Sequence, residues 1–345
     1  MDVRTGLSYD DVLLVPQRSP VDSRSEVDLS TELTPAISLD LPLLSAPMDT
    51  VTEAETAIAL SEIGGFGTIH RFLSIDEQAA EVRRAKEAGA TVGAAIGITD
   101  GFLERAEAVV EAGADALVVD VAHGHLEKCL DATARVRDSF PDAELVAGNV
   151  ATPSAVHDLA EAGVDAVKVG IGAGSHCTTR AVAGAGVPQL TAVDDCADAA
   201  REHGVRVIAD GGIRSSGDAV KALMAGADTV MLGRLFAATD ESPGELIERE
   251  GRIYKRSRGM ATTAANEARS DKTAEGHHVD EGVEGLTAYQ GTIAEVVADF
   301  TSGIQSGLSY CGGRTIEEAR DSAEFIKIEE GTQRRNSAHG VLLED

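Results

Sequence analysis

EAGADALVVD at 111–120 returns as EAGVDAVKVG at 161–170 and as MAGADTVMLG at 224–233. In each copy, a glycine lies between a helix-like segment and four or five apolar or β-branched residues. Gly113, Gly163 and Gly226 fit the position just past a helix end, where the backbone enters the left-handed region that suits glycine. The apolar residues that follow fit a strand buried on both faces. The repeat therefore predicts a helix end joined to a buried strand.

Five further apolar runs raise the number of expected strands to eight. They are LPLLSAP at 41–47, FGTIH at 66–70, TVGAAIG at 91–97, AELVAGN at 143–149 and VRVIADGG at 205–212. Stretches with the period of amphipathic helices lie between the runs, at 75–86, 103–112, 130–139, 155–162, 196–203 and 217–225. Strands that alternate with helices pair in parallel, and eight such units close into a (β/α)₈ TIM barrel. An open, doubly wound α/β sheet is the structural alternative.

The stretch 252–291, after the eighth expected strand, breaks this alternation. It carries several glycines together with His277 and His278, and it shows no apolar periodicity. Because it is too long for an ordinary connection, we interpret it as a mobile active-site flap, with plain disorder as the alternative. Helices are expected at 293–302 and 316–326, and the polar tail from Glu329 is expected on the surface or against a neighbouring subunit. We therefore expect residues 1–345 to form one barrel domain.

The composition is that of a large globular protein with an acidic surface. The chain of 345 residues is 43% hydrophobic and has neither a leader nor a long apolar run, so we expect a cytoplasmic protein without a membrane segment. A net charge of −28, spread along the chain, disfavours nucleic-acid partners. Few aromatic residues and few lysines accompany this charge, a combination typical of halophilic proteins. An acidic protein with a basic partner is the alternative.

Polar residues and glycines follow the expected strands, at the end where parallel barrels carry their active sites. Gly211, Gly212 and Gly233 follow the last two strands, where backbone amides bind phosphate in many barrels. Ser175 can add a hydroxyl, and Asp210 is placed to hold a ribose hydroxyl. These residues predict a nucleotide site, although the glycines can also be simple turn formers.

Cys177 differs from the other cysteines, since it lies in the Gly-rich segment GIGAGSHCTTR at 170–180. Arg180 or the amides of this loop can supply the positive field that activates a thiolate nucleophile. An inert thiol is the alternative for Cys177 and the expectation for Cys129, Cys196 and Cys311.

His123 and His125 are two residues apart and can chelate zinc from the end of a strand. No carboxylate pattern completes such a site in the sequence, so we favour exposed loop histidines.

These motifs closely resemble the inosine-monophosphate dehydrogenase and guanosine-monophosphate reductase family. The resemblance runs from GLSYDDVLLVP at 6–16 to RRNSAHGV at 334–341 and includes SEVDLST (25–31), LLSAPMDTVTE (43–53), GVPQLTAV (186–193), IADGGIRSSGD (208–218), RGM (258–260), EGVEG (281–285) and YQG (289–291). The family's regulatory cystathionine-synthase-type repeats would lie between the second and third strands. Residues 75–93 cross that gap directly, which implies a catalytic barrel alone.

The resemblance also implies roles for individual residues. By this resemblance, Cys177 is the nucleophile that attacks purine C2 and forms a thioimidate intermediate. Thr179 and Glu281 form a proton relay. The implied nucleotide-binding residues are Ser175, Asp210, Gly211, Gly212, Gly233, Arg234, Gly259, Met260 and Gly282. The implied cofactor-binding residues are Ser23, Arg24, Arg71, Asp120, Val121, Ala122, Asn149 and Gly170. Carbonyls of Gly172, Gly174 and Cys177 would hold a monovalent cation, potassium, and the family implies a homotetramer.

The sequence departs from the family at three positions. His176 stands where an apolar residue is usual, and the role of this histidine does not follow from the sequence. Ser257 replaces a phosphate-contacting Tyr of the dehydrogenases, and Asn336 replaces a Glu near the tail.

The flap separates the two enzymes of the family. The dehydrogenases hydrolyse the covalent intermediate with a flap Arg-Tyr pair, whose Arg acts as base. Here Arg269 is followed by Ser270, and no Tyr lies between Met260 and Glu281. Ser23 and Arg24 match a reductase segment that reaches a neighbouring subunit's cofactor, and an arginine there suits the 2′-phosphate of NADPH.

We therefore expect NADPH-dependent reductive deamination of GMP to IMP and ammonia. The alternative is an NAD-dependent IMP dehydrogenase that makes XMP. The segments HGH (123–125) and EGVEG (281–285) favour this alternative. A non-catalytic nucleotide sensor and a metal-dependent hydrolase are the remaining alternatives.

Overall fold

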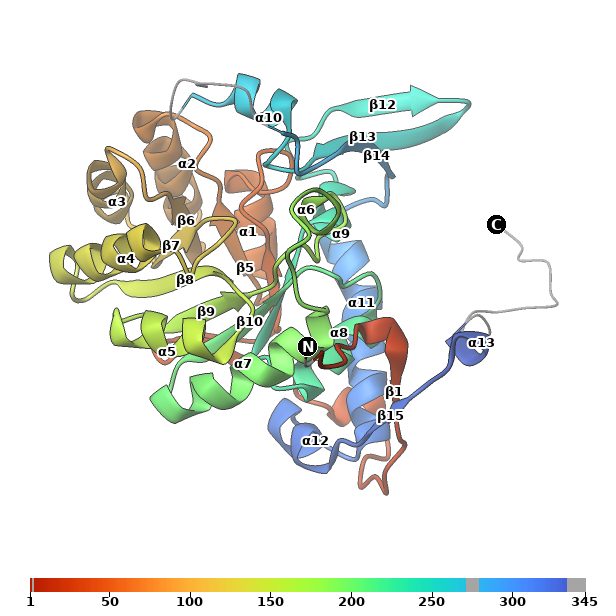
Figure 1. Cartoon of the computed structure of the whole chain (residues 1–345). Helices are drawn as coiled ribbons and strands as arrows, with labels where there is room; N and C mark the ends of the chain where they lie inside the picture. The colour runs from red at the N-terminus through yellow and green to blue at the C-terminus, as the bar shows by residue number, and fades with distance from the viewer. Residues whose placement is uncertain (2, 271–278, 334–345) are drawn as a thin grey trace.

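Eight parallel strands form a closed barrel in the computed structural model, which describes residues 1, 3–270 and 279–333 (Figure 1). The barrel strands are β4 (Leu43–Ser45), β5 (Phe66–Ile69), β6 (Val92–Ile96), β7 (Ala116–Asp120), β8 (Glu144–Val150), β9 (Ala166–Val169), β10 (Arg206–Asp210) and β11 (Thr229–Leu232). β11 pairs with β4, so the sheet closes on itself. Each predicted apolar run contains one barrel strand. The (β/α)₈ prediction is confirmed, and the open sheet is excluded.

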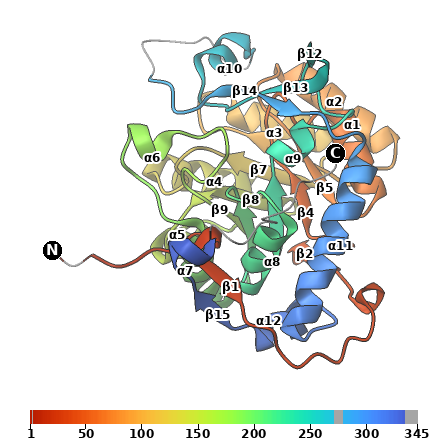
Figure 2. The same ribbon diagram turned by 90° about the vertical axis from the view of Figure 1, so that its right-hand side faces the viewer.

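Helices connect successive strands on the outside of the barrel (Figures 1 and 2). They are α1 (Ala54–Glu62), α2 (Ile75–Glu87), α3 (Phe102–Glu111), α4 (Glu127–Ser139), α5 (Pro153–Glu161), α7 (Gln189–His203), α8 (Ser216–Met224) and, near the C-terminus, α11 (Ile293–Cys311). The helices predicted between the barrel strands are present, and α11 continues beyond its predicted end at 302. The sequence reasoning missed α1, because its buried face contains alanines and Thr56, which obscure the apolar period.

The repeated glycines have the predicted conformation. Gly113, Gly163 and Gly226 have φ of +97°, +93° and +112°, and they follow α3, α5 and α8. Their amides bond back into the preceding helix, as a left-handed helix end requires. The turn from each helix into the next strand is therefore fixed locally.

Apolar side chains fill the inside of the barrel and close one of its ends. Leu33 and Leu39, from the hairpin of β2 (Thr31–Thr34) and β3 (Ile37–Leu39), belong to the same cluster as the inward-facing Phe66, Val118 and Met231. The carboxyl ends of the strands lie at the opposite end of the barrel. The interior is thus a packed core beneath the site.

The structure describes residues 252–270 and 279–291 of the stretch 252–291, and these parts contain strands and a helix. That the stretch moves as a flap stays a prediction. β13 (Arg252–Arg258) pairs with β12 (Leu246–Arg249) and β14 (Glu284–Ala288), and α10 (Thr263–Ala268) follows β13. Both views place this sheet and α10 at one end of the barrel (Figures 1 and 2). Antiparallel pairing satisfies the backbone without apolar periodicity, which explains the missed strands. His277 and His278 lie outside the described residues.

The predicted helix at 316–326 is wrong in its second half. α12 spans Ile316–Ser322, and β15 (Phe325–Lys327) then pairs antiparallel with β1 (Val12–Leu14). A distant partner strand overrides the local helical pattern. The remaining short elements are η1 (Tyr9–Asp11), η2 (Arg24–Glu26), α6 (Thr179–Val182), α9 (Arg234–Ala237) and α13 (Glu330–Gln333). Asn336 and the end of the tail lie outside the described residues.

The charge imbalance predicts stability that depends on salt. Asp and Glu number 58 against 30 Lys and Arg, and at low ionic strength this excess repels across the surface. At molar salt the screening length is only about 3 Å, so we expect a higher melting temperature there. Circular dichroism melts in dilute buffer and in molar NaCl measure the difference. Sucrose, which stabilises compact states without screening, is the control. Equal melting temperatures at both salt concentrations would contradict this prediction.

Candidate active site

A cavity of about 670 Å³ opens at the carboxyl ends of the barrel strands, beneath the flap. This volume is within the roughly 300–1,000 Å³ of small-molecule sites. The cavity contains most of the residues that the sequence predicted for catalysis, for the cofactor and for the cation. The predicted residues that line it are Cys177, Thr179, Glu281, Met260, Asp210, Arg71, Asp120, Val121, Ala122, Asn149, Gly170, Gly172 and Gly174.

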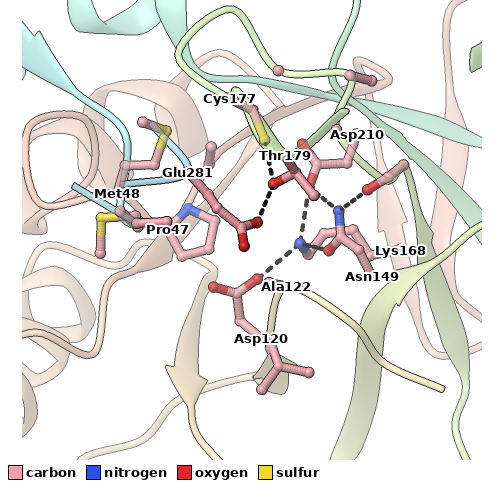
Figure 3. A pocket seen from close by; sticks show the side chains of 18 of the residues that line it. Pro47, Met48, Asp120, Ala122, Asn149, Lys168, Cys177, Thr179, Asp210 and Glu281 are labelled. Carbon is pink, nitrogen blue, oxygen red and sulfur yellow. Dashed lines mark hydrogen bonds and ion pairs between the residues drawn. The ribbon is translucent and has the colours of Figure 1, made fainter. Parts of the chain in front are cut away.

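Cys177, Thr179 and Glu281 form a continuous polar chain in this cavity (Figure 3). The Cys177 Sγ lies 3.2 Å from the Thr179 Oγ1, and the Thr179 hydroxyl donates to the Glu281 Oε2 at 2.7 Å. Because the hydroxyl donates to the carboxylate, its oxygen remains able to accept from the thiol or to pass a proton onward. The arrangement provides a proton path between the nucleophile and a carboxylate.

Backbone pairing places Glu281 beside the cysteine loop. The amide of Thr178 donates to the Glu281 carbonyl at 2.9 Å, and the amide of Val283 donates to the His176 carbonyl at 2.9 Å. Cys177 and Gly282 therefore face each other in an isolated antiparallel bridge. The flap strand and the loop after β9 hold each other in position.

Arg180 fixes the shape of the loop and does not line the cavity. Its Nε donates to the Ile171 carbonyl at 3.2 Å, and a terminal nitrogen donates to the Val187 carbonyl at 2.5 Å. Gly170 must be glycine here, since its φ is +153° and a Cβ would collide with the Asp210 carbonyl. The loop is thus held by backbone carbonyls and close backbone contacts.

Lys168, on β9, is a site residue that the sequence reasoning missed. Its Nζ lies 2.8 Å from the Asp120 Oδ1 and 2.8 Å from the Asp210 Oδ2, and it also contacts the Asn149 Oδ1 (Figure 3). Burial alone would lower the pKa of this ammonium, but the charges of the two carboxylates outweigh burial and raise the pKa above its usual value.

The repeat itself held the signal for Lys168. The three copies align Lys168 with Val118 and Met231, which are buried inside the barrel. A lysine at a position that is otherwise apolar and interior needs a charged partner, and the strand-end carboxylates supply it.

The remaining predicted nucleotide-binding residues do not line the cavity; they are Ser175, Gly211, Gly212, Gly233, Arg234, Gly259 and Gly282. Several of the glycines permit close contact between segments. A Cβ on Gly211 would lie 2.9 Å from the Gly174 amide nitrogen, and a Cβ on Gly259 would lie 2.9 Å from the His176 carbonyl oxygen. These glycines bring the strand ends, the cysteine loop and the flap together.

His176 connects the cysteine loop to the flap sheet. Its Nε2 lies 2.9 Å from the Ser257 Oγ, which lies 3.1 Å from the Thr287 Oγ1. Burial, and then the positive charge of Arg234, lower the pKa of His176, so the neutral imidazole prevails. The side chain of Ser257 is fully buried and does not replace a phosphate-contacting tyrosine directly.

The structure does not bring Ser23 and Arg24 to this cavity. Arg24 lines a separate cavity of about 470 Å³, with Leu14, Val220 and Tyr310 among its other lining residues. Within one chain these residues therefore lie outside the cavity that contains Cys177, so a role at the cofactor would need a second subunit.

The flap docks on the loop after β5. Arg269 stacks on the Phe72 ring at 3.9 Å, and Arg71 lies 5.4 Å from the same ring. The amide of Ser270 donates to the Phe72 carbonyl at 2.9 Å, and its hydroxyl reaches that carbonyl and Glu77. Ser270 thus has a structural role in holding the flap.

The other cysteines are buried, and burial raises their thiol pKa values to about 11 for Cys129, about 12 for Cys196 and about 11 for Cys311. A thiol with such a pKa is a poor nucleophile near neutral pH. Cys177 is partly exposed in the cavity, unlike these three.

His125 pairs with Asp158 at 2.6 Å, on the outside of the barrel. Within residues 1, 3–270 and 279–333, no three His, Cys, Asp or Glu side chains are grouped so that they could hold a metal ion. No helix in these ranges is long and apolar enough to cross a bilayer.

Known proteins share this sequence and architecture. The IMP dehydrogenase / GMP reductase domain model matches residues 6–339. The chain is 36% identical to an inosine-5′-monophosphate dehydrogenase of Nitrosopumilus maritimus, over 99% of this chain and 100% of the relative. It is 34% identical to a GMP reductase of Leishmania donovani, over 97% of each chain.

Among solved structures, a GMP reductase from Trypanosoma brucei in complex with guanosine 5′-monophosphate matches with a TM-score of 0.93 at 32% identity, over 99% of both chains. Together, the domain match and these relatives show that the chain belongs to the IMP dehydrogenase / GMP reductase family of purine nucleotide oxidoreductases.

Proposed function

We propose that this protein is a GMP reductase, which converts GMP to IMP and ammonia with NADPH through a covalent intermediate on Cys177. The polar chain from Cys177 through Thr179 to Glu281 carries the proposal. It places a nucleophile, a hydroxyl and a carboxylate in one cavity, which amine release requires.

In this mechanism the Cys177 thiolate bonds to purine C2, and the C2 amine leaves as ammonia. The departing amine must gain a proton, which Thr179 delivers with Glu281 as the proton source behind it. A reduced nicotinamide, when bound, supplies the hydride that C2 receives in place of the amine. The carbon–sulfur bond then breaks, so IMP leaves and the thiolate is regenerated. One hydride and two protons are consumed for each ammonium released.

The flap favours reduction over hydrolysis. In the dehydrogenases of the family, an Arg-Tyr pair activates the water that hydrolyses the intermediate. Here Ser270 follows Arg269, and its amide and hydroxyl bond to the Phe72 carbonyl instead. Without the tyrosine, base-assisted hydrolysis loses a contribution of roughly 10²–10⁴ in rate.

The residues of the cavity fit a dinucleotide cofactor beside the purine nucleotide. Asp120 and Asp210 each carry an oxygen suited to a ribose hydroxyl, and Arg71 places a cation at the rim. Val121 and Ala122, beside Asp120, supply an apolar surface suited to a flat nicotinamide ring. Asn149 and Gly170 complete this side of the cavity.

The proposed cation fits the cysteine loop through backbone oxygens. Carbonyls of Gly172, Gly174 and Cys177 would hold potassium and keep the loop in its working shape. The Gly174 carbonyl already accepts the Cys177 amide at 3.0 Å, and a carbonyl oxygen has a second lone pair for a cation.

A homotetramer is part of the proposal, because Arg24 lies outside the main cavity. Arg24 of one subunit would then reach the 2′-phosphate of NADPH bound to its neighbour. An Arg supplies paired donors that match a phosphate group.

IMP dehydrogenation is the competing function. The name of the Nitrosopumilus maritimus relative favours it, as does the EGVEG run at 281–285. Arg269 also lines the cavity, where a base would have to act. A different residue would then have to replace the missing tyrosine.

Absorbance at 340 nm with two substrate pairs tests the proposal. We expect rapid NADPH consumption with GMP, with release of IMP and ammonia, and slow or stalled turnover with IMP and NAD. The reason is that the intermediate has a route to reduction but no fast route to hydrolysis. Rapid NADH formation from IMP, with no NADPH consumed by GMP, would instead identify a dehydrogenase.

A further inference from the structure

We infer that Lys168 is a positioning residue that aligns the carboxylate on the nucleotide side of the cavity with the carboxylate on the cofactor side. Because Lys168 holds both side chains, Asp210 and Asp120 each direct one carboxylate oxygen towards a ribose hydroxyl of a bound ligand. The inference rests on the proposed function, because that function assigns a ribose-bearing ligand to each side.

The contacts of Lys168 use all of its hydrogen-bonding capacity. An ammonium has three donors, and here the three acceptors are Asp120, Asp210 and Asn149. The Lys168 side chain is only 3% exposed, whereas both carboxylates are partly exposed. Lys168 thus lies in the cavity wall but is almost fully covered, and the two carboxylates offer the more exposed surface to a ligand (Figure 3).

The charges show why Lys168 positions other groups and does not donate a proton. The paired carboxylates keep the ammonium protonated, and a buried lysine without them would be costly. Asp120 and Asp210 in turn share one cation at 2.8 Å each, so removal of the cation leaves two like charges facing each other. Each carboxylate thus depends on Lys168 for its charge and its orientation.

The unused oxygens of the two carboxylates indicate the ligand chemistry. The Asp210 Oδ2 accepts from both Lys168 and Asn149, and Asn149 is held by the Gly170 carbonyl at 2.7 Å. No donor from the described part of the chain reaches the Asp210 Oδ1 or the Asp120 Oδ2. Oxygens of this kind on a cavity wall accept hydrogen bonds from hydroxyl groups, such as those of a ribose.

Nucleotide affinity with and without ribose hydroxyls tests the inference. Titration calorimetry compares GMP with 2′,3′-dideoxy-GMP for the wild type, Lys168→Met and Lys168→Arg. A hydroxyl bonded to a carboxylate contributes enough that we expect the wild type to prefer GMP by about tenfold or more. Lys168→Met should lose most of this preference, and Lys168→Arg should recover part of it.

Lys255 offers a matched control. It is also 3% exposed, but it bonds to the Asp240 and Ser242 carbonyls on the flap side and does not line the cavity. Lys255→Met should lower the melting temperature and leave the preference for GMP unchanged. If Lys168→Met does not fold by circular dichroism, Lys168→Gln, which keeps a donor, takes its place in the comparison.

The arginine variant separates positioning from a structural role. Lys168→Arg keeps a positive charge that can pair with Asp120 and Asp210, whereas Lys168→Met leaves the two carboxylates without a shared cation. The preference for GMP over 2′,3′-dideoxy-GMP should therefore be larger in Lys168→Arg than in Lys168→Met, even where the two variants melt at the same temperature. Glu281, Arg71 and Arg269 line the same cavity and are identical in both variants, so they do not account for a difference.

The outcomes are distinguishable from those that test the proposed function. Wild-type protein that binds neither GMP nor IMP would overturn the proposed function and this inference with it. Wild-type protein that prefers GMP over 2′,3′-dideoxy-GMP, together with Lys168→Met that keeps the same preference, would overturn the role of Lys168 alone.

Discussion

Cys177→Ala is expected to abolish turnover with GMP and with IMP while both nucleotides still bind. In the proposed mechanism the Cys177 thiolate forms the bond on which either reaction depends, and among the described residues it is the only cysteine that lines the cavity. Because a covalent pathway is removed and not a single hydrogen bond, we expect a loss of at least about 10⁴-fold. The substitution leaves the proposed nucleotide contacts of Asp210 and of the surrounding glycines in place. Steady-state kinetics and titration calorimetry measure the two effects.

Cys311→Ala is the matched control for this loss. Cys311 carries the same group but is buried in α11, where burial raises its pKa to about 11. Its removal should leave turnover per folded molecule close to that of the wild type. Near-normal turnover of Cys177→Ala would refute the covalent mechanism.

Glu281→Gln is expected to slow GMP reduction by about 10²–10⁴-fold, which is the usual contribution of a positioned acid or base. Thr179 and Glu281 are hydrogen-bonded at 2.7 Å, so the Glu281 carboxyl, once protonated, can pass a proton through the Thr179 hydroxyl to the departing amine. Hydride transfer between IMP and NADP needs no such proton. A single turnover of IMP with NADP should therefore remain close to the wild-type rate, measured by stopped-flow absorbance at 340 nm.

Glu284→Gln provides a comparison in the same segment of the flap, three residues after Glu281. Glu284 begins β14 and is exposed, and it does not line the cavity. Its neutralisation should affect neither step. An equal slowing of amine release and hydride transfer in Glu281→Gln would count against the proton relay and favour a general loss of active-site structure.

The sequence by itself determined the barrel and the side of it that carries the site. Gly113, Gly163 and Gly226 mark the same helix end in each repeat, and the apolar run after each one is a buried strand. These features depend on residues close together in the chain, through backbone conformation and side-chain period. Cys177 stood out for the same reason, because its glycine-rich surroundings are visible in a few neighbouring residues.

Only the tertiary structure decided which distant side chains meet. Glu281 reaches Thr179 because the flap pairs with the cysteine loop, and β15 replaces the end of a predicted helix because β1 lies beside it. Lys168 finds its two carboxylates because β7, β9 and β10 end at one rim of a closed barrel. Arg24 lies in a separate cavity because the folded chain places it beside residues of α8 and α11. Local patterns fix the elements, whereas contacts across the barrel depend on how the whole chain closes, which no short stretch encodes.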